Sequence, residues 1–316
     1  MNRENGSFGA VMQRITATPA AAHSRRAAYL LLAGVVVLWG ANWPVMKLGL
    51  AELPPFWFAA IRVILGAFCL FAVLALGGNL ALPGRRDMVQ LLGGGILQVA
   101  VYMGLVNLAL VSVAPGRAAV LAYTTPLWAV PGAMLFLGER MGALKAAGLV
   151  LGFGGVVVLF NPLGFDWSDR QQVMGNLMLM GAAFAWAAAI MLIRGRPWHL
   201  TPLQLAPWQL LLAGGLLLAA AYIGEGPLFV HLTPKVIAIL AYNGPVCISF
   251  CFWASVAIAR ALPAVTSSLS FLAVPAFGIA ASAAVLGERI DLTLIGGFAL
   301  ILAGVVLVAA ADRRVR

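Results

Sequence analysis

The tetrapeptide Leu-Gly-Glu-Arg occurs twice in this chain, at residues 137–140 and again at residues 286–289. The same offset of 149 residues superposes Pro126 on Pro275, Gly148 on Gly297, and Gly155-Val156-Val157 on Gly304-Val305-Val306. An offset of 147 residues extends the match toward the N-terminus, with Trp39 on Trp186, Lys47 on Arg194, Pro55 on Pro202 and Arg62 on Gln209. This internal similarity predicts that the chain is built from two related halves.

The composition places both halves in a membrane. Of the 316 residues, 63% are hydrophobic and 9% are charged, whereas about a quarter of the residues in a soluble globular protein are charged. Such a chain cannot form large soluble domains. The three cysteines, Cys69, Cys247 and Cys251, all lie in apolar stretches and have neither a disulfide framework nor a metal-ligand spacing.

Ten apolar runs follow one another, and a run of about 20 residues crosses a bilayer core about 30 Å thick. They lie near 27–46, 56–77, 89–112, 116–137, 144–161, 175–193, 204–223, 236–259, 264–286 and 292–311. No segment keeps the period-two alternation of a membrane β-barrel. The sequence therefore predicts an all-α membrane protein with ten transmembrane helices. Because five is odd, the halves, at 27–162 and 174–311, are expected to be inverted repeats, as in secondary transporters.

The net charge of +10 is spread singly between the apolar runs, which indicates orientation signals and no nucleic-acid partner. With the N-terminus inside, fourteen Lys and Arg residues fall on the cytoplasmic side: Arg3, Arg14, Arg25, Arg26, Arg85, Arg86, Arg140, Lys145, Arg194, Arg196, Arg260, Arg313, Arg314 and Arg316. The other side has five: Lys47, Arg117, Arg170, Lys235 and Arg289. This bias predicts that both termini are cytoplasmic. Residues 1–26 are polar and small and have no apolar period, so they are expected to be a disordered cytoplasmic tail. A cleavable signal peptide is the rival interpretation, and the apolar run that follows is too long for it.

Several motifs resemble the EamA family of the drug/metabolite transporter superfamily. They are Trp39-Gly40-Ala41-Asn42-Trp43, Ala114-Pro115-Gly116-Arg117-Ala118-Ala119, Leu262-Pro263-Ala264, and the paired Pro126 with Gly138-Glu139-Arg140 and Pro275 with Gly287-Glu288-Arg289. The resemblance covers residues 27–311. It implies a ten-helix inner-membrane carrier whose central cavity is lined by helices 1, 3, 4, 6, 8 and 9, in a family with members that export amino acids or other metabolites.

No Asp, Glu or His lies within an expected span, so neither a buried proton relay nor an intramembrane enzyme site is visible. No cofactor is expected, and no ring of charges indicates a channel. Energy coupling then has two interpretations. The protein is a uniporter or exchanger, or it couples through a group at a helix end such as Glu139 or Glu288.

Arg62 is the one charged residue well inside a span, where an arginine costs about 2.5–3.5 kcal/mol on insertion scales. One interpretation is that it binds a substrate carboxylate. The other is a structural pairing, or snorkelling to the surface roughly 9 Å away. Lys47 and Arg117, at helix ends, are interpreted as interface anchors.

Aromatic, amide and hydroxyl groups within the spans are the other candidates for a substrate-binding cavity. They are Trp39, Asn42, Trp43, Gln98, Tyr102, Asn107, Tyr123, Thr125, Trp186, Tyr242, Asn243, Trp253 and Ser267. Such a lining suits an organic solute better than an inorganic ion. For a single Ser or Thr, a bond to its own helix is the competing interpretation.

Glycines on helices 5 and 10, at Gly148, Gly152, Gly154-Gly155 and Gly296-Gly297, are expected to let these helices approach closely. Together the patterns predict a secondary transporter, most simply an exporter of an amino acid or related compound. A carrier for a nucleoside, sugar or drug is the alternative. Its partners would be the solute and membrane lipid, and a homodimer is left open.

Overall fold

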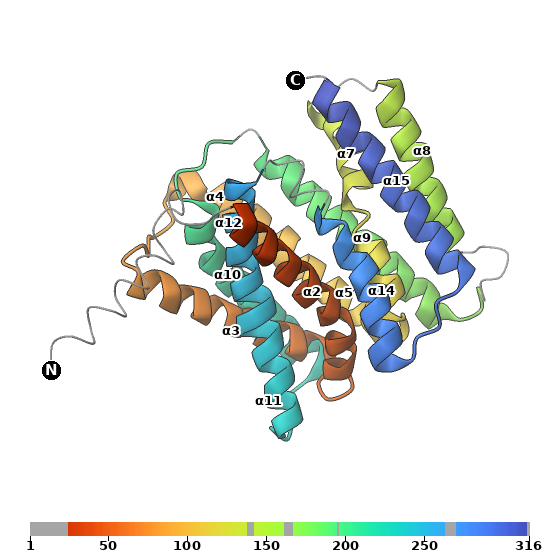
Figure 1. Cartoon of the computed structure of the whole chain (residues 1–316). Coiled ribbons are helices and arrows are strands. Elements are labelled where there is room, and N and C mark those ends of the chain that lie inside the picture. The colour runs from red at the N-terminus through yellow and green to blue at the C-terminus, as the bar shows by residue number, and fades with distance from the viewer. Residues whose placement is uncertain (1–24, 138–141, 161–166, 195, 263–269, 315–316) are drawn as a thin grey trace, which may run out of the picture.

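The computed structural model describes residues 25–137, 142–160, 167–194, 196–262 and 270–314. Every regular element in these ranges is a helix (Figure 1). Eight helices are long and apolar enough to cross a membrane, and two shorter apolar helices, Ala143–Leu159 and Ala273–Leu286, complete the set of ten. The ten-helix prediction is confirmed.

The first half contains five helical units. They are α2 (Arg25–Leu50), α3 (Pro55–Leu76), a third unit formed by η1 (Arg85–Asp87), α4 (Met88–Leu92), η2 (Gly93–Val101) and α5 (Tyr102–Ser112), a fourth formed by α6 (Pro115–Ala122) and α7 (Thr125–Leu137), and α8 (Ala143–Phe160).

The second half repeats the order. It contains α9 (Arg170–Ile193), α10 (Pro202–Glu225), a third unit formed by α11 (Pro234–Ala241), η3 (Tyr242–Phe250) and α12 (Cys251–Ala261), then α14 (Ala273–Leu286) and α15 (Leu292–Arg314). The start of α9 lies five residues before the predicted 175. Asp169 accepts hydrogen bonds from the backbone N–H groups of Gln171 and Gln172 and so starts the helix in a polar segment that hydropathy misses. The expected start of the ninth span, at 264, lies outside the described residues.

The helices pack as two related sets. The most extensive contacts join α8 to α15 and α3 to α10, and each of these pairs unites corresponding helices of the two halves (Figure 1). The contact of α5 with α9 is matched by that of α12 with α2, and the contact of α14 with α2 is matched by that of α7 with α9. This reciprocal packing is the arrangement that a pseudo-twofold axis produces.

Two irregularities also repeat at the offset of 149 residues. The π-helices η2 and η3 have nine residues each and occupy equivalent positions. A Cβ at Gly95 in η2 would lie 3.1 Å from the carbonyl oxygen of Gln209, and a Cβ at Gly244 in η3 would lie 3.1 Å from that of Arg62. Arg62 and Gln209 are the residues that the sequence repeat aligns. Because π-helices are rare and concentrate at functional sites, this matched pair directs attention to the helices around Arg62.

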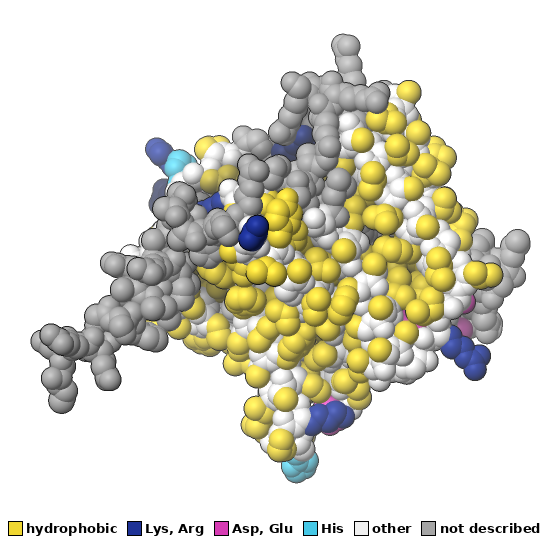
Figure 2. Space-filling model, viewed as in Figure 1, with side chains coloured by type: hydrophobic (Ala, Val, Ile, Leu, Met, Phe, Trp, Pro, Cys, Tyr) yellow, Lys and Arg dark blue, Asp and Glu magenta, His cyan; other side chains and the backbone are white. Residues whose placement is uncertain are grey.

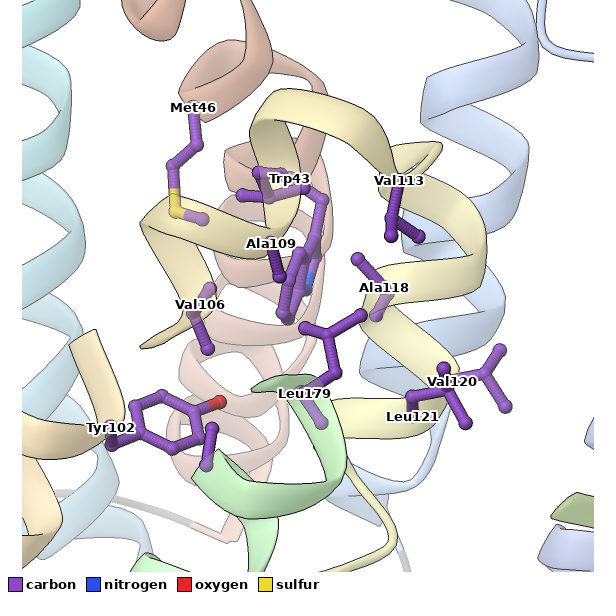
Figure 3. Packing of buried hydrophobic residues seen from close by; sticks show 14 of the residues in the cluster. Trp43, Met46, Tyr102, Val106, Ala109, Val113, Ala118, Val120, Leu121 and Leu179 are labelled. Atoms are coloured by element: carbon purple, nitrogen blue, oxygen red, sulfur yellow. The ribbon is translucent and has the colours of Figure 1, made fainter. Parts of the chain in front are cut away.

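The largest described apolar cluster includes residues of α2, α5, α6 and α9. Figure 3 shows Trp43 of α2 within this cluster, together with Ala109, Ala118 and Leu179. Trp43 is only 6% exposed. The predicted cavity residue Trp43 therefore packs as a core side chain in this conformation.

Candidate functional site

Arg62 is at the centre of a buried polar cluster. Its side chain is 1% exposed. Nη1 donates to Oδ1 of Asn243 at 3.1 Å and to the sulfur of Met46 at 2.8 Å. Nη2 donates to Oδ1 of Asn107 at 3.2 Å and to the sulfur of Met103 at 3.0 Å. The guanidinium therefore turns into the bundle, and the snorkelling interpretation is wrong.

All these partners of Arg62 are electrically neutral. No Asp or Glu of the described residues forms an ion pair with it. The ring of Phe58 lies 5.3 Å from the guanidinium carbon and offers a cation–π contact. Nε has no partner within the described part of the chain. A buried ion costs several kcal/mol in effective desolvation, which neutral groups offset only in part. The cluster therefore has an uncompensated positive charge.

The cluster draws on four helical units and both halves of the chain. Met46 lies one helical turn after Asn42 on α2, and Met103 lies one turn before Asn107 on α5. Asn42 Nδ2 also donates to the Met46 sulfur at 3.1 Å, and its buried Oδ1 is without a partner among the described residues. Sequence reasoning missed both methionines because they resemble ordinary apolar residues. Their four-residue spacing from an asparagine was the available signal.

Aromatic groups adjoin this cluster and connect the helices. Tyr102 and Trp186 form an edge-to-face pair with ring centroids 4.7 Å apart. Trp39 Nε1 donates to the carbonyl oxygen of Cys247 at 2.9 Å. The Tyr242 hydroxyl donates to the carbonyl oxygen of Leu38 at 2.8 Å. These aromatic side chains therefore tie α2 to η3 and α5 to α9 around the buried charge.

The other predicted residues are more dispersed. Gln98 is half-buried in η2, and Tyr123 lies at the break between α6 and α7. Thr125 Oγ1 donates to the carbonyl oxygen of Ala122, as the competing interpretation expects. Trp253 packs on Phe250 at 5.9 Å between ring centroids. Ser267 and Glu139 lie outside the described residues.

At the end of the bundle where α2 ends and α3 begins, here called the α2–α3 end, charged side chains cap helices. Lys47 Nζ donates to the carbonyl oxygen of Leu110 at the end of α5. Arg117 Nη2 donates to the carbonyl oxygen of Leu159 at the end of α8. Both cations thus complement helix dipoles, which is more specific than the interface anchoring expected of them.

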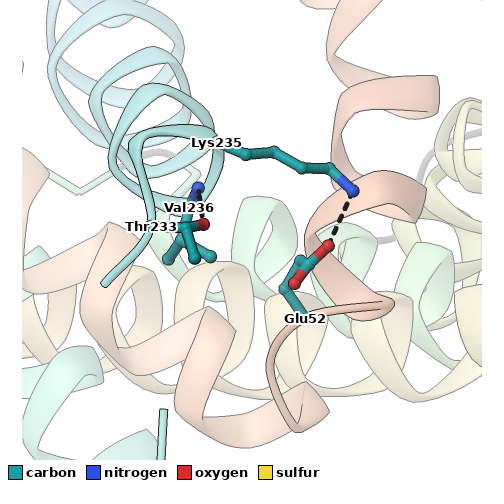
Figure 4. A network of polar contacts seen from close by, with 4 residues as sticks. All are labelled: Glu52, Thr233, Lys235 and Val236. Carbon is teal, nitrogen blue, oxygen red and sulfur yellow. Dashed lines mark hydrogen bonds and ion pairs between the residues drawn. The ribbon is translucent and has the colours of Figure 1, made fainter. Parts of the chain in front are cut away.

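A surface ion pair at the same end joins the two halves. Lys235 Nζ, at the start of α11, lies 2.6 Å from Oε1 of Glu52, in the turn after α2 (Figure 4). Both side chains are partly exposed, at 55% and 31%. An exposed pair of this kind contributes about 0–1 kcal/mol to stability, so it holds the two halves together only weakly.

Glu288, in the connection between α14 and α15, is an acidic residue that caps the start of a helix, as Lys47 and Arg117 cap helix ends. Its Oε2 accepts a hydrogen bond of 2.9 Å from the backbone N–H of Gly116, at the start of α6. Burial raises the pKa of the Glu288 carboxyl, and the bonds from the backbone and the charge of Lys47 oppose that rise without cancelling it. Nearby Asp291 raises it further.

Because the folded protein holds this proton more tightly than the unfolded chain, stability is expected to fall as the pH rises from the ordinary glutamate range through the raised pKa. Melting temperatures measured between about pH 4 and pH 8 should show this decline in the wild type. Glu288→Gln keeps an acceptor for Gly116 and should flatten the profile. Equal slopes in the two proteins would contradict this role of Glu288.

A bundle of ten apolar helices in two related halves, with polar groups meeting between them, is an architecture that membrane transporters use. The chain belongs to the EamA-like transporter family, which matches residues 26–161 and 173–310. It is therefore a transporter and not an enzyme.

Named relatives agree with this assignment. An uncharacterized transporter of Bacillus subtilis, YoaV, is 26% identical over 271 residues, which cover 86% of this chain and 92% of that protein. A protein of Salmonella typhimurium named as a probable amino-acid metabolite efflux pump is 28% identical over 300 residues, covering 89% and 94%. A solved crystal structure shares the fold with a TM-score of 0.60, at 24% identity, and covers 93% of this chain and all of that one.

Proposed function

We propose that this protein exports a small organic metabolite bearing a carboxylate, most simply an amino acid, across the inner membrane. The observation that carries the proposal is the buried guanidinium of Arg62, whose hydrogen-bond partners are all neutral. A carboxylate is the group that complements a guanidinium, through two parallel hydrogen bonds. The name of the Salmonella typhimurium relative supports the same solute class.

In this proposal the two five-helix halves are inverted repeats that rock about the Arg62 cluster, with both termini in the cytoplasm. The repeats would extend over 27–162 and 174–311. The reciprocal packing of the helices supports that arrangement, and so does the excess of Lys and Arg at the end of the bundle where α3 ends and η1 begins. Trp39, Asn42, Tyr102, Asn107, Trp186 and Asn243 would line the path of the solute.

Counterflow in proteoliposomes tests the solute class. Vesicles preloaded with an unlabelled amino acid should take up its labelled form saturably, whereas the amine formed by removing its carboxyl group should not exchange. The matched pair differs only in the group that Arg62 would bind. Equal exchange of acid and amine would overturn the carboxylate proposal, and exchange of nucleosides or sugars alone would favour the other solute classes.

The same vesicles test the coupling. The described membrane spans contain no His, and their two carboxylates, Asp87 and Glu225, lie at the ends of spans. Because none lies inside a span, exchange should be insensitive to an imposed pH gradient. A gradient that drives net accumulation would instead point to a carboxylate at a helix end, with Glu288 as the described candidate.

A further inference from the structure

A basic pocket opens at the end of the bundle where α3 ends and η1 begins, here called the α3–α4 end. It has a volume of about 400 Å³ and is lined by Arg86, Val89, Gln90, Arg196, Pro197 and His199. Figure 2 shows Lys, Arg and His side chains gathered on the part of the surface where Figure 1 places α4. The volume lies within the range of small-molecule sites. The pocket shares no residue with the Arg62 cluster.

The pocket is positively charged because the nearby carboxylate, Asp87, accepts hydrogen bonds from backbone N–H groups instead of lining the pocket. Asp87 is 5% exposed and does not line the pocket. Its Oδ2 accepts from the backbone N–H of Gly84 at 3.0 Å, and its Oδ1 accepts from that of Leu200 at 3.3 Å. The bond from Leu200 joins the two segments of the chain that line the pocket. The exposed side chains of Arg86 and Arg196 then face solvent without an acidic partner on the pocket's lining.

Gln90 adds a second requirement for the ligand, a hydrogen-bond donor. Its side chain is 1% exposed. Nε2 donates to the carbonyl oxygen of Pro197 at 2.8 Å, which fixes the amide orientation. Oε1 is buried and has no partner among the described residues. A buried acceptor of this kind costs about 1–3 kcal/mol unless a donor reaches it. The site therefore suits a ligand that has both negative charge and a hydrogen-bond donor.

We propose that this pocket binds a phosphate ester that also carries a hydroxyl or amine group. Arg86 and Arg196 bind the phosphate oxygens, and the Oε1 of Gln90 accepts from the hydroxyl or amine. Val89 and Pro197 contact the carbon chain between these groups. The ligand is a phospholipid headgroup or a soluble phosphate ester, and both have this chemistry.

The pocket's two walls come from different halves of the protein. Arg86, Val89 and Gln90 belong to η1 and α4 of the first half, and Arg196, Pro197 and His199 belong to the connection between α9 and α10 of the second. A bound phosphate ester bridges the halves and stabilises the folded protein by an amount that rises with the logarithm of the ligand concentration once the site is filled. Binding is therefore measurable as a rise in melting temperature, independently of any transported solute.

The test uses the purified full-length chain in detergent, with lipid binding followed by native mass spectrometry and by melting temperature. Phosphatidylglycerol supplies charge and hydroxyls, phosphatidylmethanol supplies the charge alone, and phosphatidylcholine supplies neither net charge nor a donor. We expect binding in that order. Arg86→Gln with Arg196→Gln should weaken phosphatidylglycerol binding about tenfold or more.

The control is Arg170→Gln with Arg289→Gln, which removes two exposed charges from the opposite end and should bind as the wild type does. Glycerol 1-phosphate separates the two sources of ligand. If it raises the melting temperature and displaces phosphatidylglycerol, the ligand is soluble, and if it does neither while the lipid binds, the ligand is a lipid headgroup. Equal losses in the two double variants, or no preference for phosphatidylglycerol over phosphatidylmethanol, would overturn the proposal.

Discussion

Arg62→Gln is expected to reduce counterflow of a carboxylate solute by about a hundredfold or more, while the melting temperature stays the same or rises. Truncating one partner of a buried, hydrogen-bonded charge pair typically costs 2–5 kcal/mol or more of binding. Folding responds in the opposite direction, because the wild type buries a charge with no acidic partner among the described residues. Glutamine still donates a hydrogen bond, so the amides of Asn107 and Asn243 do not both lose their partner.

Two further variants separate binding from packing. Arg62→Lys keeps the charge but loses the planar fork, so partial exchange with weaker solute affinity is expected. Gln209 is the repeat equivalent of Arg62, and its Nε2 donates to the backbone carbonyl oxygen of Gln90 at 2.7 Å. Gln209→Met should lower the melting temperature without changing the preference for acid over amine. If Arg62→Gln unfolds the protein and the molecules that remain folded still transport, Arg62 is structural and the proposed solute chemistry is wrong.

The ten helices and their duplication could be predicted because hydropathy and short motifs encode them directly. The π-helices could not, because a widened hydrogen-bond ladder leaves the apolar pattern unchanged. The offset between the two LGER motifs nevertheless places Gly95 on Gly244, and both are glycines where a neighbouring carbonyl lies within 3.1 Å of a Cβ position. A glycine shared between repeats thus marked the irregular segment.

The sequence could predict which residue types form the candidate site, but not which of these residues contact one another. The sequence singled out Arg62, Asn107 and Asn243 separately, since each is polar in an apolar run. Their convergence depends on how α3, α5 and η3 are rotated about their axes, which packing across the two halves determines. Within α2 and α5, the i,i+4 spacing that brings Met46 and Met103 to the guanidinium was readable. The sequence interpretation did not consider that a methionine sulfur can accept a hydrogen bond from a buried cation.

In the contact between α8 and α15, glycines bring the two backbones directly together. A large loss of stability is expected when one of these glycines is replaced. A Cβ at Gly155 would lie 2.7 Å from the carbonyl oxygen of Gly297, and a Cβ at Gly304 would lie 2.5 Å from that of Gly148. The glycines predicted to allow close helix approach therefore do so at Gly148, Gly152, Gly155 and Gly297. Gly154, which the sequence grouped with them, has nothing within 4 Å of its Cβ position.

Gly155→Leu is accordingly expected to destabilise the protein by about 3 kcal/mol, since the backbone of α15 cannot yield as a flexible side chain does. Gly154→Leu is the matched control, because it makes the same substitution in the same helix turn, and its stability should stay within about 1 kcal/mol of the wild type. Denaturation of both variants in detergent measures the difference, and equal losses would show that helix propensity and not interhelix contact is responsible. Surviving Gly155→Leu protein should still prefer acid over amine. That outcome is the reverse of the one for Arg62→Gln, because α8 and α15 contribute no residue to the buried cluster that surrounds the guanidinium.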